Sequence, residues 1–366
     1  MPGLPIRRRL NRQDAKKFAW HEFTLASWRF NLSRKFKRIF DARAIESIEI
    51  RMTLPTSGHE PVMLNEVLEH LSPAAGQTVV DCTIGRAGHA LAIGQRLGET
   101  GLLIGLDADP RNLEFAAGRL KGVTCRVRMF HANFGRLSQV LGEAGNPPVN
   151  AIVADLGVST NQLFDPGYGM SFDRPGPLDM RLDPDLPENA ADLVNRLPEE
   201  ALANVLYELA QERYSRQIAR KIVERRRVSP IRDTEALAEL VRSAIPRRGG
   251  PPARIDPATR TFLALRMAVN REMENLGCLL KQGPAALAAG GRIAVISFQS
   301  MEDRSVKQAF RSLEQTGLMK VITKKPLSPT AEESARNPRS RSAKMRVIQK
   351  LATDKNQMHT DKIKTI

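Results

Sequence analysis

The chain has 366 residues, 42% of them hydrophobic, so it is long enough to bury a sizeable core. It has no apolar run of about 18 residues and no signal-peptide pattern, which excludes a membrane-spanning helix and predicts a soluble protein without a membrane partner. Its three cysteines, Cys82, Cys125 and Cys278, lack CxxC spacing, so we expect a reducing compartment, no disulfide framework and no metal site.

Positive charge is concentrated at the start of the chain. The net charge is +16, and residues 1–51 hold 13 Lys and Arg against 5 Asp and Glu. This excess predicts a polyanionic partner, because basic groups that neutralise phosphates release condensed counterions. We interpret residues 1–51 as a flexible basic extension, with a true start at Met52 as an alternative. A transit peptide is a third possibility, which would change the expected location from the cytoplasm to the mitochondrial matrix.

From residue 77 onward, short apolar runs alternate with amphipathic segments. This is the pattern of an α/β protein in which helices flank a parallel sheet. We expect strands at residues 77–81, 101–107, 125–134, 150–157 and 291–298. Roughly 130 residues separate the last two strands, far more than one crossover helix needs, so an insertion is predicted.

The predicted insertion, residues 165–256, has helical character. Apolar residues recur at helical spacing through residues 201–227, and residues 234–245 predict a further helix with Asp233 or Thr234 as its N-cap. We expect one helix over residues 259–276 to return the chain to the sheet.

The glycine loop after the first strand, "VVDCTIGRAGHALAIG" at residues 79–94, limits the choice of cofactor. It lacks the Gly-Lys-Ser/Thr of a P-loop, and Ala87 replaces the second glycine of a dinucleotide fingerprint. The remaining pattern, Asp-x-x-x-Gly-x-Ala, resembles motif I of class I methyltransferases, which bind S-adenosyl-L-methionine. Asp107 ends the second strand, where a carboxylate accepts both ribose hydroxyls of an adenosine. NAD would suit this carboxylate equally, and a plain glycine turn is the remaining alternative.

Six segments of the chain form a recognisable set, in which "GPLDMR" together with "PATRTF" is far more specific than any glycine loop. They are "HEPVMLNEVL" at 59–68, "DCTIGRAGH" at 81–89, "DLGVSTNQLFDPGYGMSFDRPGPLDMR" at 155–181, "DPATRTFLALRMAVNRE" at 256–272, "GGRIAVISFQSMEDR" at 290–304 and "NPRSRSAKMR" at 337–346. In this order they resemble the RsmH (MraW) family of rRNA cytosine-N4 methyltransferases. The resemblance covers about residues 59–350.

This resemblance implies a class I, Rossmann-like methyltransferase with a mostly parallel sheet and an inserted all-helical subdomain. The methyltransferase domain would comprise residues 52–164 and 257–350, the insertion residues 165–256, and a flexible tail residues 351–366. The implied substrate is the exocyclic N4 amine of a decoding-centre cytosine in 16S rRNA, with the 30S subunit as partner. A homodimer is left open.

The resemblance also assigns candidate cofactor-binding residues. They are Ala87, Gly88, His89, Asp107, Phe134, Asp155 and Gln162, to which the resemblance to motif I adds Asp81 and Gly85. Phe134 follows the third strand, where an aromatic face can pack on adenine, and Asp155 ends the fourth strand at the edge where α/β ligands bind. Phe134 as plain core and His89 as a helix-start residue are the structural alternatives.

The chemistry requires positioning more than a strong base. A cytosine amine is a poor nucleophile because its lone pair is delocalised into the ring, and it loses its proton only after positive charge has developed. Acceptors that hold its hydrogens would turn the lone pair toward the methyl group. We expect Asp155, Ser159 and Asn161 to be the catalytic residues.

A base in folded rRNA must be splayed out before it can react, so basic side chains should hold the flanking backbone. The candidates are Arg213, Arg216, Arg220, Lys221 and Arg225–Arg227 in the insertion, and Arg336, Arg339, Arg341, Lys344 and Arg346 near the C-terminus. A solvated surface is the alternative for each of them.

Four positions depart from the family pattern. Ala87 stands where glycine is usual, Asp256 and Gln299 where histidine is usual, and Leu263 where glutamine is usual. These changes leave open a divergent, non-catalytic RNA-binding or ribosome-assembly protein. A nicotinamide-dependent oxidoreductase is a more distant alternative, since the dinucleotide fingerprint is incomplete.

Overall fold

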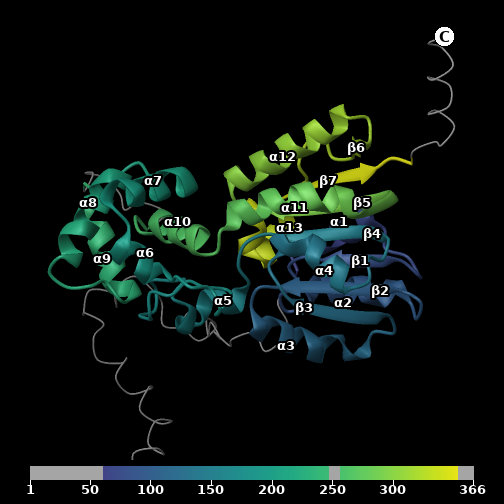
Figure 1. Cartoon of the computed structure of the whole chain (residues 1–366), viewed down its shortest axis with the longest axis horizontal. Helices are drawn as coiled ribbons and strands as arrows, with labels where there is room; N and C mark the ends of the chain where they lie inside the picture. Colours follow the sequence, from purple (N-terminus) through teal and green to yellow (C-terminus); the bar gives the residue numbers. More distant parts are fainter. Residues whose placement is uncertain (1–60, 247–255, 353–366) are drawn as a thin grey trace, which may run out of the picture. The chain divides into compact units, whose positions relative to one another are not determined.

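The computed structural model describes residues 61–246 and 256–352 (Figure 1). The predicted basic extension at residues 1–51 lies outside the described residues, as does residue 353 onward of the predicted tail. None of the helices in the described part of the chain is long and apolar enough to cross a membrane.

The described residues form one mixed sheet, whose strand order is β3-β2-β1-β4-β5-β7-β6. The strands are β1 Thr78–Asp81, β2 Leu102–Asp107, β3 Arg126–His131, β4 Val149–Asp155, β5 Leu287–Ser297, β6 Met319–Val321 and β7 Lys344–Lys350. Strands β1 to β5 are parallel, whereas β7 is antiparallel to both β5 and β6. The predicted mostly parallel α/β fold is confirmed. The sequence did not predict β6 and β7.

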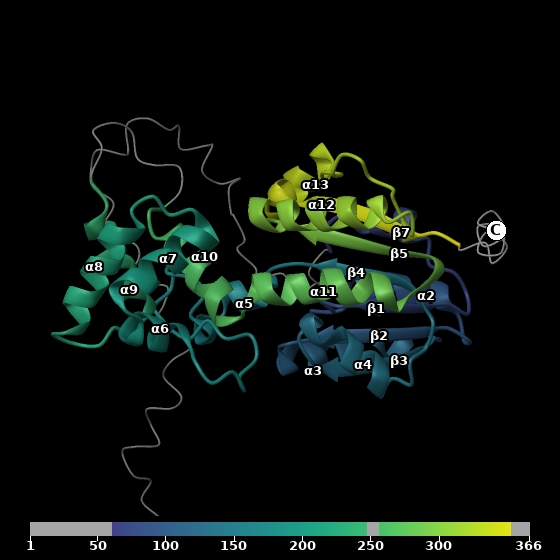
Figure 2. The same cartoon turned by 45° about the horizontal axis from the view of Figure 1, so that its top comes forward.

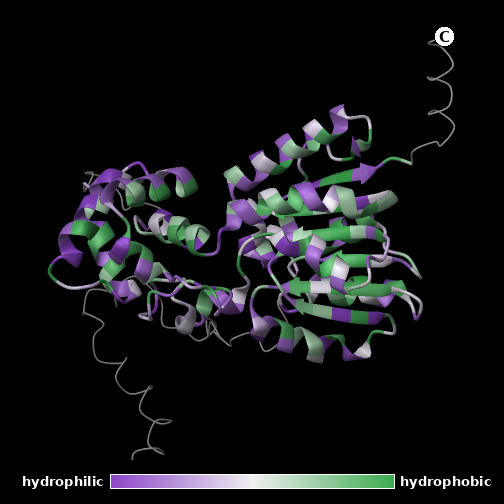
Figure 3. Ribbon diagram, in the orientation of Figure 1, coloured by the Kyte–Doolittle hydropathy of each residue, from purple (hydrophilic) through white to green (hydrophobic). Residues whose placement is uncertain are grey.

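Helices cover both faces of the sheet because successive strand residues point to opposite sides. In β4, Ala151 and Val153 join the core beneath one set of helices, whereas Ile152 and Ala154 join the core on the other face. The first set is α1 Leu64–Leu71, α2 Gly88–Leu97 and α3 Pro110–Arg119, and the second is α4 Leu137–Glu143, α11 Glu272–Ala286 and α12 Ser300–Gln315. Figure 2 shows α11 and α12 running along their face, and Figure 3 shows the strands as mainly hydrophobic.

A separate group of helices has its own apolar core. It contains α6 Ala190–Arg196, α7 Glu199–Ala210, α8 Ser215–Arg226, α9 Thr234–Ala244 and α10 Thr259–Val269. Leu206, Ile222 and Leu237 from three of these helices are fully buried in that core. The side chain of Asp233 accepts a hydrogen bond from the backbone N–H of Ala236, so Asp233 is the N-cap of α9 as one alternative predicted.

The single helix predicted over residues 259–276 is wrong. Helix α10 ends at Val269, Arg271 adopts a left-handed conformation with φ 49°, and α11 begins at Glu272. Phe262 in α10 packs in the core of the helical group and contacts Phe172 edge to face, with ring centroids 5.0 Å apart. Helix α10 therefore shares its core with the helices of the predicted insertion. The boundary predicted at residue 256 stays a prediction.

Two further short α-helices lie near the strand ends. They are α5 Thr160–Phe164, which follows β4, and α13 Ala331–Arg336, which precedes β7 (Figure 1).

Candidate functional site

Three aspartates end neighbouring parallel strands. Asp81, Asp107 and Asp155 are the last residues of β1, β2 and β4, so they lie at the same edge of the sheet. The strand order changes direction between β1 and β4, and crevices at such a point are where ligands bind in open α/β sheets. The candidate site is therefore centred on Asp81 and Asp155.

Asp107 fixes the glycine loop. Its Oδ2 accepts a hydrogen bond from the Gly85 N–H at 2.8 Å, and its Oδ1 accepts one from the Asp109 N–H at 2.8 Å. Burial raises the pKa of Asp107 to about 6, opposed by these hydrogen bonds. Gly85 has φ +50°, and Ala87, which precedes α2, has φ 60°. Ala87 thus occupies a left-handed conformation, which favours glycine.

Thr83 joins the ends of β1 and β4. Its backbone N–H donates to Asp81 Oδ1 at 3.1 Å, and its hydroxyl accepts from the Asp155 N–H at 2.7 Å. Within the described residues, Oδ2 of Asp81 and Oδ1 of Asp155 are buried without a hydrogen-bond partner. Buried polar atoms are usually paired, so these two oxygens fit a ligand that carries positive charge or hydrogen-bond donors.

The pKa values of the two carboxyl groups support this interpretation. Burial, and then the nearby Asp107 carboxylate, raise the pKa of Asp81 to about 7. Burial raises the pKa of Asp155 well above its ordinary value, with further contributions from Asp81, Glu302 and Glu333. A bound cation would oppose both causes and favour the charged carboxylates.

Of the three predicted catalytic residues, Asp155 ends β4, and Ser159 and Asn161 lie on the segment that follows it. The Ser159 N–H donates to Gln162 Oε1 at 2.9 Å, and Asn161 Nδ2 donates to Asn112 Oδ1 at 3.2 Å. Oδ1 of Asn161 is buried and has no hydrogen-bond partner in the described part of the chain. Asn161 therefore keeps a buried acceptor without a partner among the described residues, and its catalytic role stays a prediction.

Asp109 is a positioning residue that the sequence analysis missed. It is fully buried, and its Oδ2 accepts hydrogen bonds from Gln162 Nε2 at 2.9 Å and from the Tyr168 hydroxyl. Its Oδ1 accepts the Arg111 N–H and caps α3. The Asp-Pro pair at a helix start signals this cap, but no sequence signal indicates the two distant partners. Both amide atoms of Gln162 therefore bond to protein groups, and its cofactor contact stays a prediction.

Gly88 and His89 pack against the segment that precedes α1. A Cβ atom at Gly88 would lie 2.9 Å from Cβ of Pro61, and the buried His89 ring bonds through Nε2 to the Val62 carbonyl at 2.9 Å. His89 thus helps to fasten the start of α2, as the structural alternative proposed. Phe134 is partly buried against the core beneath α4 and α11, and its contact with adenine stays a prediction.

Two of the most specific sequence motifs meet at Asn270. Its Nδ2 donates to the Met180 carbonyl at 2.8 Å, and its Oδ1 accepts the Leu182 N–H at 2.8 Å. Asp179 and Arg181 form a bidentate ion pair beside this contact, with both N–O distances 2.8 Å. The "GPLDMR" turn is therefore held at the junction of α10 and α11.

The positions that depart from the family pattern have local structural roles. Asp256 accepts the Ala258 N–H at 2.8 Å and forms an ion pair with Arg242 at 3.0 Å. Gln299 is the N-cap of α12, and its N–H donates to Glu302 Oε2 at 2.9 Å. Leu263 is partly buried within α10. Asp256 and Gln299 are thus accommodated by their surroundings.

The basic residues near the C-terminus do not form one exposed set. Arg346 in β7 is buried and forms a bidentate ion pair with Asp303 on α12, at 2.7 and 3.2 Å. Its predicted place in an RNA groove is therefore wrong, because the guanidinium is already paired in the interior. Arg339 donates to the Thr160 hydroxyl at 2.6 Å, which brings it beside α5 and the candidate site.

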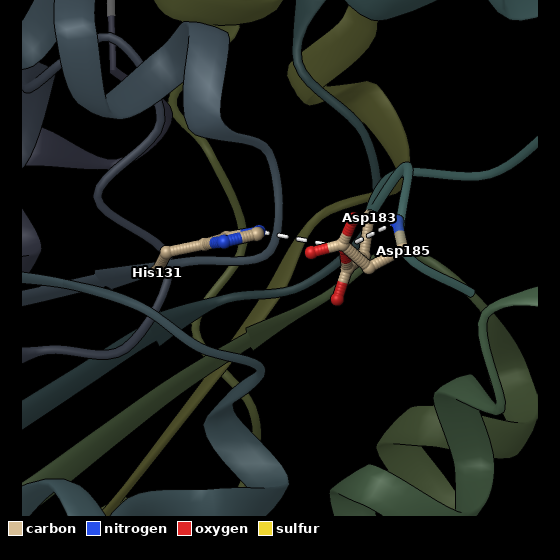
Figure 4. Close-up of side chains that lie close together, drawn as sticks. All are labelled: His131, Asp183 and Asp185. Atoms are coloured by element: carbon tan, nitrogen blue, oxygen red, sulfur yellow. Dashed lines mark hydrogen bonds and ion pairs between the residues drawn. The ribbon is translucent and has the colours of Figure 1, made fainter.

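A mixed cluster lies at the end of β3 (Figure 4). His131 Nε2 is 3.4 Å from Asp183 Oδ1, which also accepts the Asp185 N–H at 2.9 Å. One ligand atom from each residue lies within 4.8 Å of the others. We assign no metal to this cluster, because exposed acidic groups commonly gather without one and the contacts shown already pair His131 with Asp183.

A family model and the curated relatives described here both point to the same family of methylases. Residues 56–351 match the model of the MraW methylase family. The ribosomal RNA small subunit methyltransferase H of Syntrophobacter fumaroxidans is 43% identical over 311 residues, covering 81% of this chain and 97% of that protein. The protein of the same name from Solibacter usitatus is 44% identical over 291 residues, which cover 80% of this chain and 99% of that protein.

Similarity to solved structures is weaker. An rRNA methylase from Streptococcus thermophilus has a TM-score of 0.37 and 11% identity, covering 81% of this chain and 100% of that chain. This similarity is too low to add to the fold described above.

Proposed function

This chain belongs to the MraW methylase family, and from that premise we propose that it methylates the N4 amine of a decoding-centre cytosine in 16S rRNA. The methyl donor is S-adenosyl-L-methionine, and the place of action is the cytoplasm. The observation that carries the proposal is the family match over residues 56–351, which spans both the sheet and the helical group. A homodimer stays a prediction.

The residues at the strand ends fit this cofactor. S-adenosyl-L-methionine supplies a methyl group on a positively charged sulfur, together with an ammonium group and two ribose hydroxyls. Asp81 and Asp155 have unpartnered buried oxygens that suit cationic and donor groups. Asp107 would accept a ribose hydroxyl through Oδ1, which accepts only the Asp109 N–H, whereas Oδ2 already accepts from Gly85 and from Asn112 Nδ2.

Asp155 would then orient the target amine. A carboxylate that accepts a hydrogen bond from the amine turns the nitrogen lone pair toward the methyl group. Asn161 Oδ1 is a second candidate acceptor, since it has no partner among the described residues.

The test of this proposal is a methylation assay on 30S subunits prepared without this modification. With labelled S-adenosyl-L-methionine, nucleoside mass analysis should detect N4-methylcytidine, and mass analysis of nuclease fragments should locate it at one position. Asp155→Asn should fold and bind RNA normally but lower the transfer rate by on the order of 10²-fold or more, because a donor replaces an acceptor at the reacting centre.

The non-catalytic alternative predicts a different outcome. It is favoured by the departures at Asp256, Leu263 and Gln299, yet Asp256 and Gln299 make local contacts that do not involve Asp155. A protein that binds 30S subunits tightly but leaves every nucleoside unmodified would support this alternative. Transfer by Asp155→Asn at the wild-type rate would instead assign Asp155 to the scaffold.

A further inference from the structure

A polar cavity lies between α7 and α8, within the helical group. Its volume is about 360 Å³, within the range of small-molecule sites. It is lined by Ala203, Asn204, Tyr207, Arg213, Tyr214, Ser215, Arg216 and Gln217. The lining therefore combines two tyrosines, two arginines and two amide side chains, and it contains no acidic residue.

The side chains of this cavity are available to a ligand. Tyr207 is 54% exposed, although aromatic residues are usually more buried. Within the described residues, Arg213 and Arg216 have no ion-pair or hydrogen-bond partner, in contrast to Arg220, which lies 3.8 Å from Glu199. The aromatic face of Tyr207 and the two exposed guanidinium groups are therefore open to a ligand.

The first turn of α8 adds backbone donors to the same cavity. Tyr214, at the N-cap position, provides no side-chain hydrogen bond to the helix, and the N–H groups of Arg216 and Gln217 have no acceptor in the described residues. Unpaired N–H groups and the helix dipole attract anions, phosphate above all. Groups that can bind a phosphate and an aromatic face that can stack on a base thus line the same cavity.

The cavity is also held in shape before any ligand arrives. Gln211 ends α7 in a left-handed conformation with φ 54°, and the buried Glu212 accepts the Tyr214 N–H at 2.9 Å. Arg260 in α10 donates to the Gln211 carbonyl at 3.1 Å. A preformed turn lowers the entropy cost of binding.

We propose that this cavity binds one unpaired nucleotide of the RNA substrate, its base stacked on Tyr207 and its phosphate held by Arg213, Arg216 and the start of α8. The inference rests on the proposed function only in that the partner is RNA. The surrounding charge agrees with a polyanion, because α8 carries five Lys and Arg and one Glu. The cavity would hold a nucleotide other than the target, because it is formed by the helical group and contains none of the strand-end aspartates.

The test uses the full chain and single-stranded RNA oligonucleotides that carry one 2-aminopurine. When the RNA binds, stacking of the 2-aminopurine base on Tyr207 should quench the fluorescence of 2-aminopurine. Tyr207→Ala should abolish the quenching and weaken RNA binding ~5- to 100-fold, the range for losing one base-aromatic stack. Tyr207→Phe keeps the ring and should retain both. Arg216→Ala should weaken binding, whereas Arg96→Ala removes the same charge from the exposed end of α2 and should change it far less.

Two further measurements decide what the cavity holds. Adenosine monophosphate should bind much more weakly than the oligonucleotide, and equal affinity would show a free-nucleotide site and overturn the proposal. In 30S methylation, Tyr207→Ala should raise KM and leave kcat near the wild-type value, with an unchanged unfolding midpoint. If Tyr207→Ala leaves both RNA affinity and KM unaltered, the proposed nucleotide site is also overturned. If wild-type protein binds and quenches the RNA without methylating 30S subunits, the proposed function fails but the nucleotide site stands.

Discussion

At the scale of single residues, the candidate site buries three carboxyl groups in surroundings that disfavour their charged form. Asp81, Asp107 and Asp155 are all largely buried, and each has a raised pKa because burial penalises the charged form. Such a site is stable when the carboxyls are protonated and becomes costly when they ionise. A cationic ligand removes that cost, so affinity for the ligand is obtained at the expense of stability without it.

The substitution Asp81→Asn tests whether ligand affinity at this site is obtained at the expense of stability. Between the ordinary carboxyl pKa and about 7, the folded state holds the Asp81 proton and the unfolded chain does not, so stability falls as pH rises through that window. Each pKa unit corresponds to ~1.4 kcal/mol. Asp81→Asn should therefore raise the free energy of unfolding by a few kcal/mol at most near pH 8 and change it little near pH 4. Denaturant titrations at the two pH values measure this.

The same variant should bind S-adenosyl-L-methionine more weakly, because the amide replaces a charged oxygen with a neutral donor. In the wild-type protein, affinity should fall as pH drops below about 7, where Asp81 takes up a proton. Calorimetry across this range provides the check. Affinity independent of both pH and the Asp81 substitution would place the ligand away from the end of β1.

At the scale of elements, the sequence predicted those parts that are locally encoded. The five parallel strands are short apolar runs, and Asp81, Asp107 and Asp155 were found because each ends such a run. Strand β6 has three residues, and β7 contains the buried Arg346, whose partner Asp303 lies on another element. The break at Arg271 occurs at a residue with no turn signal, and only the tertiary structure identifies Tyr168 as a partner of Asp109.

Asn270→Ala tests the junction of α10 and α11. Asn270 is 5% exposed, and its side chain donates to two carbonyls and accepts one N–H. Alanine would leave these backbone groups unpaired, which should lower the free energy of unfolding by about 3 kcal/mol. Asn204→Ala, at an exposed position on α7, should cost less than about 0.5 kcal/mol. Equal costs for the two variants would show that the contact is not important for stability.

At the scale of the whole molecule, charge is distributed unevenly. Residues 1–51 carry 13 Lys and Arg against 5 Asp and Glu, within a chain of net charge +16. Their structure lies outside the described residues, so their contribution is argued from charge alone. Basic groups far from a reaction centre strengthen binding to RNA in a way that depends on salt and not on sequence.

Deletion of residues 1–51 should leave the unfolding transition and the cofactor affinity unchanged. It should also weaken RNA binding and reduce the slope of log affinity against log salt, since fewer counterions are released. Filter binding over a range of salt concentrations measures both effects. A broadened unfolding transition after deletion would instead give the extension a structural role.

The pairing of β4 with β5 has a consequence for how the chain folds. These strands are neighbours, yet β4 ends at Asp155 and β5 begins only at Leu287, with the helical group between them. The contacts of that group are close in sequence, whereas completing the sheet requires closing a very long loop, and folding slows as contacts become more distant. During synthesis, strands β1 to β4 emerge well before the strand that covers the open side of β4. The nascent sheet thus has an unpaired edge until the helical segment has been made.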